Sequence, residues 1–230
     1  MRMMGAAEGL KVSGARVTGA SSNGRTSDFD SEYQGSNPCA PASCPSRSVR
    51  GERVALMPTK VLQLVAVGAV PPTLLKDLEE PIRLHLGATI VQGKATLPAP
   101  AYAFNKDRNQ YHSTAIMRRL ATVLEPGQLL FGVVDVDLFH PDSPFIFGES
   151  DRETRIGVLG LARLRQGVDH EGFRRRLRVE GLHQAGHLVG LSYCEDQRCV
   201  MVLSQTQQEV DKKHPTLCHV CRNELAKLNR

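Results

Sequence analysis

The chain has 230 residues, of which 41% are hydrophobic, 23% charged and 5% aromatic, as expected for one globular domain with a flexible extension. Its longest apolar stretch, residues 61–70, is interrupted by Gln63 and Gly68. It is far shorter than the ~20 apolar residues of a membrane-spanning helix. The net charge of +5 is spread along the chain and gives only weak support for nucleic-acid binding.

The first 56 residues have a composition of their own. Gly and Ser make up 16 of these 56 residues, and Leu, Val and Phe together only 7. Such a segment buries too little apolar surface to offset the entropy of ordering, so we predict a disordered leader over residues 1–56. Its stretch GRTSDFDSEYQGSNPCAPA resembles a translated transfer RNA gene. We therefore hypothesise that the native chain begins at Met57, and we assign no role to Cys39 and Cys44.

Periodic apolar runs begin after residue 57 and predict an α/β domain over residues 57–190. We expect strands at residues 60–70, 88–91, 128–138 and 155–164, with a further short strand at 145–147 followed by a turn at 148–151. Helices are expected from Pro72, with Pro81 kinking or ending the first one early, at 111–124 and at 171–189. Residues 191–230 are expected to form short turns that carry four cysteines.

Six cysteines occur in a chain without an apolar secretory signal. We therefore expect a cytoplasmic protein with reduced thiols, in which cysteines bind metal more readily than they form disulfides.

Two histidines lie four residues apart near the end of the last predicted helix. At this spacing the imidazoles of His183 and His187 project from one face and can hold one metal ion. Gly190 then allows a turn with positive φ, which would return the residue at position 193 towards the same metal.

This pattern resembles the metzincin motif H-E-x-x-H-x-x-G-x-x-H, which is followed by a methionine-containing turn. More narrowly, residues 57–230 resemble the archaemetzincin family, in which four cysteines form a second, structural zinc site. The resemblance implies a compact metzincin-like mixed sheet with an active-site helix and a C-terminal four-cysteine zinc subdomain over residues 191–230. It assigns Met201 to the methionine turn and the structural zinc to Cys194, Cys199, Cys218 and Cys221.

The cysteine spacing itself supports that zinc site. A C-x4-C pair, eighteen residues and a C-x2-C pair fit a tetrahedral four-thiolate zinc that leaves no position open for water. His214 and His219 lie nearby as alternative ligands. One structural zinc is thus expected.

Two positions depart from the family motif. Gln184 replaces the glutamate that acts as general base, and an amide cannot accept the proton of the attacking water. Tyr193 replaces the third histidine and leaves at most a weak ligand, because a phenol has a reference pKa of about 10 and must ionise to bind metal well.

Other readings of the histidine region stay open at this point. The pair His183 and His187 can be metal-free, and Glu180, on the same helical face, can be a ligand, a solvated side chain or a partner of a histidine. His112, His140 and His170 have no ligand spacing and are expected to be ordinary histidines.

The sequence thus predicts a zinc metallopeptidase scaffold that is inactive or severely impaired but binds peptide in its cleft. By resemblance, residues 145–147 would supply the edge strand along which the peptide lies. The alternatives are an active protease or aminopeptidase with an unconventional site, and a zinc-ribbon nucleic-acid module, which the scarcity of aromatic residues near the cysteines disfavours.

Overall fold

The computed structural model describes residues 60–93 and 96–230. The predictions for the leader, for Cys39 and Cys44 and for a start at Met57 concern residues outside these ranges. Within them, no helix is long and apolar enough to cross a membrane.

The main sheet has five strands in the order β2-β1-β5-β9-β8. Four of them are parallel: β1 (Val61–Val67), β2 (Thr89–Gln92), β5 (Leu129–Val134) and β9 (Ile156–Gly160). The fifth, β8 (Gly148–Asp151), runs antiparallel to β9 and forms one edge. Strands β5 and β9 are buried nearly throughout because helices cover both faces, which explains their continuous apolar sequences.

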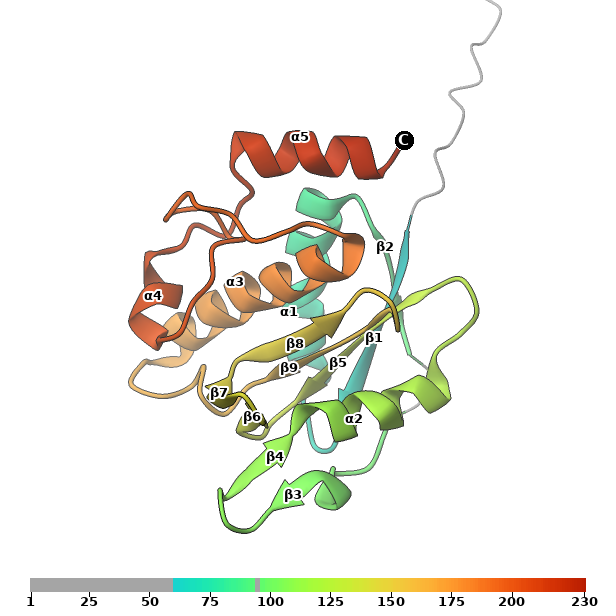
Figure 1. The fold of residues 1–230 in the computed structure, drawn as a ribbon, viewed down its shortest axis with the longest axis vertical. Coiled ribbons are helices and arrows are strands. Elements are labelled where there is room, and N and C mark those ends of the chain that lie inside the picture. Colours follow the sequence, from blue (N-terminus) through green and yellow to red (C-terminus); the bar gives the residue numbers. More distant parts are fainter. Residues whose placement is uncertain (1–59, 94–95) are drawn as a thin grey trace, which may run out of the picture. The chain divides into compact units, whose positions relative to one another are not determined.

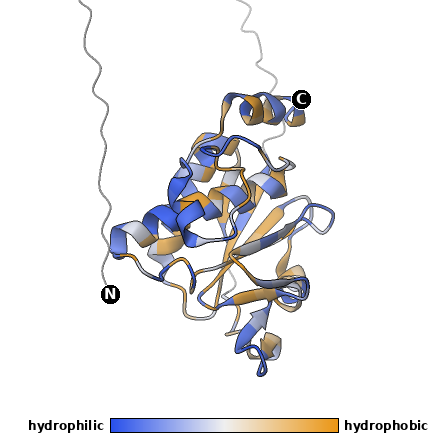
Figure 2. Ribbon diagram, turned by 60° about the vertical axis from the view of Figure 1, so that its left-hand side comes forward, coloured by the Kyte–Doolittle hydropathy of each residue, from blue (hydrophilic) through white to orange (hydrophobic). Residues whose placement is uncertain are grey.

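Three helices cover this sheet (Figure 1). Helices α1 (Pro72–Leu86) and α3 (His170–Val189) lie on one face, and α2 (Ser113–Leu120) lies on the other. Alternate residues of the strands therefore contribute to two separate cores. In Figure 2 the strands between the helices are the most hydrophobic part of the fold. The predicted mixed α/β architecture is confirmed.

Pro81 was predicted to kink or end α1 early, and the early end is wrong. The helix continues to Leu86 because Leu78 and Ile82, on either side of the proline, are fully buried in the core, and this packing outweighs the backbone hydrogen bond that proline cannot donate. The second predicted helix begins later than expected, at Ser113, and ends in a 3-10 turn, Ala121–Val123.

A second, smaller sheet was not predicted. Its strands are β3 (Phe104–Asn105), β4 (Gln110–His112), β6 (Leu138–His140) and β7 (Ser143–Ile146), in the order β3-β4-β6-β7, with a 3-10 turn, Ala101–Ala103, before β3. These strands are too short to show a period in the sequence. The run predicted as one strand at 128–138 is divided between the two sheets.

The segment predicted as a turn at 148–151 is the edge strand β8. Its polar residues look like a turn in the sequence, but they pair with β9 over all four positions. Gly148 is required there, because a Cβ atom would lie 2.6 Å from the carbonyl oxygen of Val158.

The C-terminal residues are also more regular than predicted. They contain α4 (Gln207–Lys212) and α5 (His219–Leu228) instead of turns alone. Three ion pairs join the α4 region to α3. Arg176 binds Asp211 through both carboxylate oxygens, at 2.7 and 2.6 Å, and Arg175 lies 3.8 Å from the same carboxylate. Lys213 Nζ lies 2.9 Å from Glu180 Oε1. Lys213 is fully buried and Glu180 is 2% exposed.

We expect Lys213→Met to destabilise the fold by about 3–5 kcal/mol, because Glu180 then stays buried without its partner. Adding Glu180→Leu is expected to recover most of the loss, since an apolar pair of similar volume replaces the ions. Urea unfolding at fixed zinc concentration measures both changes.

Arg178→Ala, on the helix α3 that carries Glu180, is the matched control. Its ion pair with Glu171 is solvent-exposed, at 37% and 70% of the two side chains, and is expected to contribute under about 1 kcal/mol. A loss on Lys213→Met no larger than the loss in this control would contradict the expectation.

Candidate functional site

The ε nitrogens of the two histidines of α3, His183 and His187, point toward each other. His183 Nδ1 donates to the carbonyl oxygen of Val200 at 2.8 Å, and His187 Nδ1 donates to that of Leu191 at 2.9 Å. With both δ nitrogens protonated, the two ε nitrogens carry lone pairs, and they lie 3.2 Å apart. Two nitrogens bound to one tetrahedral zinc at about 2.0–2.1 Å are separated by about 3.3 to 3.4 Å. The pair therefore fits two ligands of one metal ion.

Burial keeps these imidazoles neutral. It lowers the pKa of His183 well below the ordinary value, and the nearby Lys213 and His187 lower it further. Burial also lowers the pKa of His187. Neutral imidazole is the form that binds metal.

The turn after α3 returns the chain to the histidines. Gly190 has a left-handed φ of 110°, and the Leu191 amide donates to the carbonyl oxygen of Gly186 at 2.9 Å. Tyr193 consequently lies beside the pair, with its ring centroid 4.5 Å from that of His187. The tyrosine is nevertheless 63% exposed, so the turn brings position 193 to the site without enclosing its side chain.

Gln184 lies between the histidines and the edge strand β8. Ser150 Oγ is 2.9 Å from Gln184 Oε1 and 3.0 Å from the backbone oxygen of Gln184. The single hydroxyl proton of Ser150 can be donated to only one of these two oxygens. If the side-chain amide of Gln184 is rotated by 180°, Gln184 Nε2 donates to Ser150 Oγ, and the hydroxyl group donates to the backbone oxygen. In either orientation the side chain forms hydrogen bonds but accepts no proton from water.

Met201 lies under the turn of α3 that carries the histidines. It is fully buried, and a Cβ atom on Gly186 would lie 2.5 Å from its sulfur. Gly186 is therefore needed for the close approach of this side chain. The preceding residue, Val200, is the one that holds His183.

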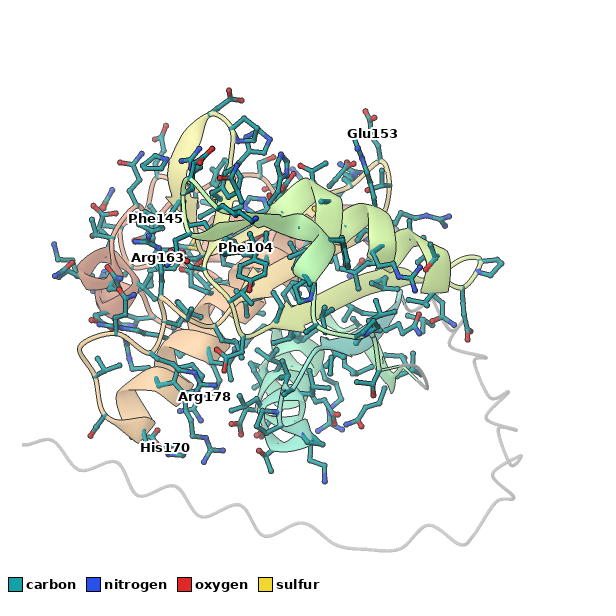
Figure 3. All side chains as sticks on the ribbon, turned by 90° about the horizontal axis from the view of Figure 1, so that it is seen from below. Phe104, Phe145, Glu153, Arg163, His170 and Arg178 are labelled. Carbon is teal, nitrogen blue, oxygen red and sulfur yellow. The ribbon has the colours of Figure 1, made fainter. Side chains whose placement is uncertain are left out.

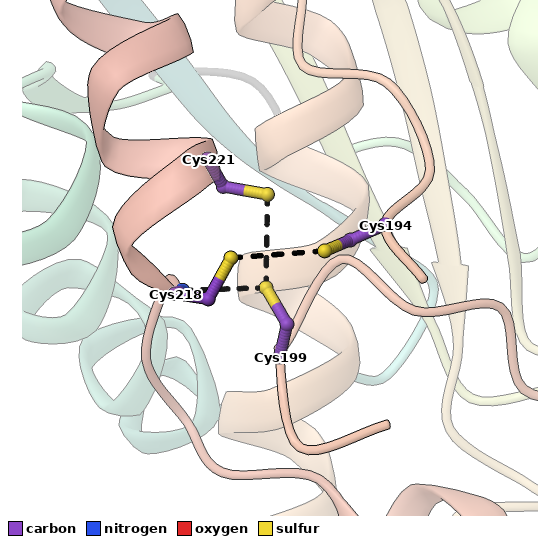
Figure 4. A group of neighbouring side chains, drawn as sticks. All are labelled: Cys194, Cys199, Cys218 and Cys221. Atoms are coloured by element: carbon purple, nitrogen blue, oxygen red, sulfur yellow. Dashed lines mark hydrogen bonds between the residues drawn. The ribbon is translucent and has the colours of Figure 1, made fainter. Parts of the chain in front are cut away.

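The four C-terminal cysteines converge as the spacing predicted (Figure 4). Their sulfurs all lie within 4.8 Å of one another, and the pairs Cys194–Cys218 and Cys199–Cys221 are 3.7 Å apart. Sulfurs bound to one tetrahedral zinc at about 2.3 Å are about 3.8 Å apart. Burial, reinforced by the neighbouring thiols, raises the pKa of Cys221 far above its ordinary value. A metal cation supplies the positive charge that lets such thiols ionise together.

No other group of three or more His, Cys, Asp or Glu ligand atoms gathers in this way among residues 60–93 and 96–230. Glu180 is bound to Lys213 instead, which accounts for its burial without a metal. His214 and His219 lie outside the cysteine group. His170 opens α3, and His112 packs against Phe139 at a ring-centroid distance of 5.1 Å.

A cleft follows the edges of β7 and β8 on both sides of Gln184. One cavity of about 610 Å³ contains His187 and Tyr193, and a second of about 480 Å³ contains His183 and Glu180. Phe145 lines the second cavity, and the guanidinium of Arg163 lies 3.9 Å from the centre of its ring (Figure 3).

Sequence reasoning did not assign Ser150 and Glu149 of β8 to the cleft, and it took His140 for an ordinary histidine. None of them has a spacing that marks it, since each reaches the cleft only through the pairing of its strand.

Comparison with known proteins agrees with this geometry. The model of peptidase family M54 matches residues 77–227. The archaemetzincin of Methanocaldococcus jannaschii is 32% identical over 69% of this chain and 89% of its own. The crystal structure of archaemetzincin from Methanopyrus kandleri has 32% identity and a TM-score of 0.66, covering 74% of this chain and 95% of that one. The crystal structure of archaemetzincin from Archaeoglobus fulgidus complexed with malonate has 28% identity and a TM-score of 0.62, and the match covers 71% of this chain and 99% of that one. The chain therefore belongs to peptidase family M54, the archaemetzincins.

Proposed function

We propose that this archaemetzincin keeps the peptidase scaffold and one structural zinc but has lost most or all of its ability to hydrolyse peptides. The observation that carries the proposal is Gln184, which lies between the histidine pair and β8 at the position where the family motif has its general base. The side chain there is held by Ser150 and has no basic atom.

The size of the loss follows from the role of a general base. Proton transfer to such a residue contributes typically about 10²- to 10⁴-fold in rate, so its absence costs roughly 3 to 5 kcal/mol of transition-state stabilisation. Gln184 can still bind a peptide amide or carbonyl through hydrogen bonds. Replacement of the general base by Gln184 thus leaves peptide binding possible while it removes peptide hydrolysis.

Tyr193 weakens the metal site independently of Gln184. A zinc ion held by His183 and His187 would supply Lewis-acid activation of water. At position 193 an exposed phenol stands where the family motif has the imidazole of the third ligand, and two imidazoles alone hold zinc weakly. Two separate replacements in one site support natural loss of activity over an engineered knockout, for which Gln184 alone would suffice.

A peptide fits the remaining cleft. The cleft is open along the edges of β7 and β8, and an edge strand offers unpaired backbone groups to an extended chain. The strand predicted at 145–147 overlaps β7 of the smaller sheet, and the edge of the main sheet is instead β8, which follows it directly. Peptide binding along this edge is the retained function that we propose.

Two alternatives have less support. An active protease or aminopeptidase needs another base near His183, and Glu180, the nearest carboxylate of α3, is bound to Lys213. A nucleic-acid module stacks bases on aromatic side chains, and Tyr193 is the only Phe, Tyr or Trp in residues 191–230. Lys213, one of the basic residues near the cysteines, is buried against Glu180.

Zinc content tests the cysteine site. Purified protein is expected to hold one zinc per chain that is lost on Cys218→Ala and kept on His183→Ala, because four thiolates bind zinc far more tightly than two imidazoles. Elemental analysis after dialysis measures both. Zinc kept by Cys218→Ala and lost on His183→Ala would show that the histidines bind the ion instead.

Restoring the family motif tests the loss of activity. The native chain is expected to show little or no cleavage of a peptide library, and Gln184→Glu with Tyr193→His is expected to raise cleavage by about 10²-fold or more, because it restores the base and the third ligand.

Gln184→Glu combined with His187→Ala is the control, since it restores the base without the ligands. Efficient zinc-dependent cleavage by the native chain would overturn the proposal.

A further inference from the structure

One short segment, residues 193–201, touches both the histidine pair and the cysteine group. Tyr193, beside His187, is followed at once by Cys194, and Cys199 is followed by Val200, which holds His183. We propose that metal bound by the four cysteines positions His183 through the Val200 carbonyl group. The inference rests on the zinc proposed for the cysteines and does not depend on whether the cleft hydrolyses peptides.

The contacts at the end of the segment near His183 are short and buried. Val200 and Met201 are fully buried, and the Val200 amide donates to the carbonyl oxygen of Thr216 at 3.1 Å. Cys199 Sγ accepts hydrogen bonds from the Met201 amide at 3.5 Å and from the Cys218 amide at 3.4 Å. The peptide groups that carry the Val200 carbonyl are thus fixed around the sulfur of Cys199.

Near Cys194, the segment is hydrogen-bonded to its own far end. The Cys194 amide donates to the carbonyl oxygen of Met201 at 3.0 Å, and Cys194 Sγ accepts from the Asp196 amide at 3.4 Å. Moving either cysteine therefore moves the backbone next to the other.

The metal matters because the four sulfurs come from two separate parts of the chain. Cys194 and Cys199 belong to the segment, whereas Cys218 and Cys221 lie at the start of α5. A metal ion joins the two parts by four bonds. Without it they are joined by packing, by weak thiol contacts and by the backbone hydrogen bonds of Val200 with Thr216 and of His214 with Arg198. Groups that orient a ligand histidine typically change metal affinity by about 10- to 100-fold, so Val200 is a positioning residue for His183.

His187 provides an internal comparison. Its Nδ1 donates to Leu191, whose amide is bound to Gly186 of α3 itself, so the helix and its own terminal turn hold this imidazole. The proposal therefore predicts a difference between the two histidines. Loss of the cysteine-bound metal should release His183 and leave His187 in place.

The test is the tautomer of each histidine, observed by ¹⁵N nuclear magnetic resonance on the full chain with labelled histidine and one zinc per chain. His183 and His187 should both show protonated Nδ1, and His183→Ala assigns the signals. Removing zinc with a chelator, or by Cys218→Ala, should abolish the Nδ1–H form of His183 and preserve that of His187. Adding zinc back to the stripped protein should restore it.

Cys218→His is the matched variant, because three thiolates and one imidazole still form a tetrahedral zinc site. It should keep zinc and the Nδ1–H form of His183. The reversible stripping of the native chain keeps the test valid if a variant misfolds. The proposal is overturned if His183 keeps its tautomer after zinc is removed, if both histidines lose theirs together, or if the native chain binds no zinc at its cysteines.

Discussion

The close contact between Gly186 of α3 and the side chain of Met201 determines where the C-terminal segment lies. Without a side chain at position 186, the methionine approaches the helix between the two histidines, and the neighbouring Val200 carbonyl meets His183. This contact holds Met201 and the Val200 carbonyl group against α3, whereas the turn after Gly190 is held by hydrogen bonds to α3 itself.

The histidine pair has the geometry of two metal ligands, but the site lacks the glutamate and the third histidine that peptide hydrolysis needs. His183 is buried and His187 half-buried, and both are neutral and oriented by backbone carbonyl groups, as metal ligands usually are. Gln184 and Tyr193 change the chemistry of two positions but not the path of the backbone. Orientation and reactivity are separable because backbone and packing determine the first, while individual side-chain atoms determine the second.

Much of the fold was predictable from residue patterns. The buried strands β1, β5 and β9 and the helices α1 and α3 are long enough for their period to be read, and the buried positions Leu74, Leu78 and Ile82 of α1 follow from it. Of the smaller sheet only β7 was anticipated, as the strand at 145–147, and β3, β4 and β6 were missed because they have two or three residues. Strand β8 was mistaken for a turn, since its polar sequence reflects an edge position that only pairing with β9 creates.

The sequence by itself determined which donor atoms are available and how they are spaced: two histidines on one helical face, a glycine turn, four cysteines in two pairs, and the replaced residues at 184 and 193. Only the tertiary structure decided what these groups meet. Glu180 faces Lys213 instead of a metal, Ser150 holds Gln184, and Val200 connects the cysteines with His183. Spacing along one helix or turn is a local property, whereas each of these contacts joins residues 17 or more positions apart and exists only once the whole chain has packed.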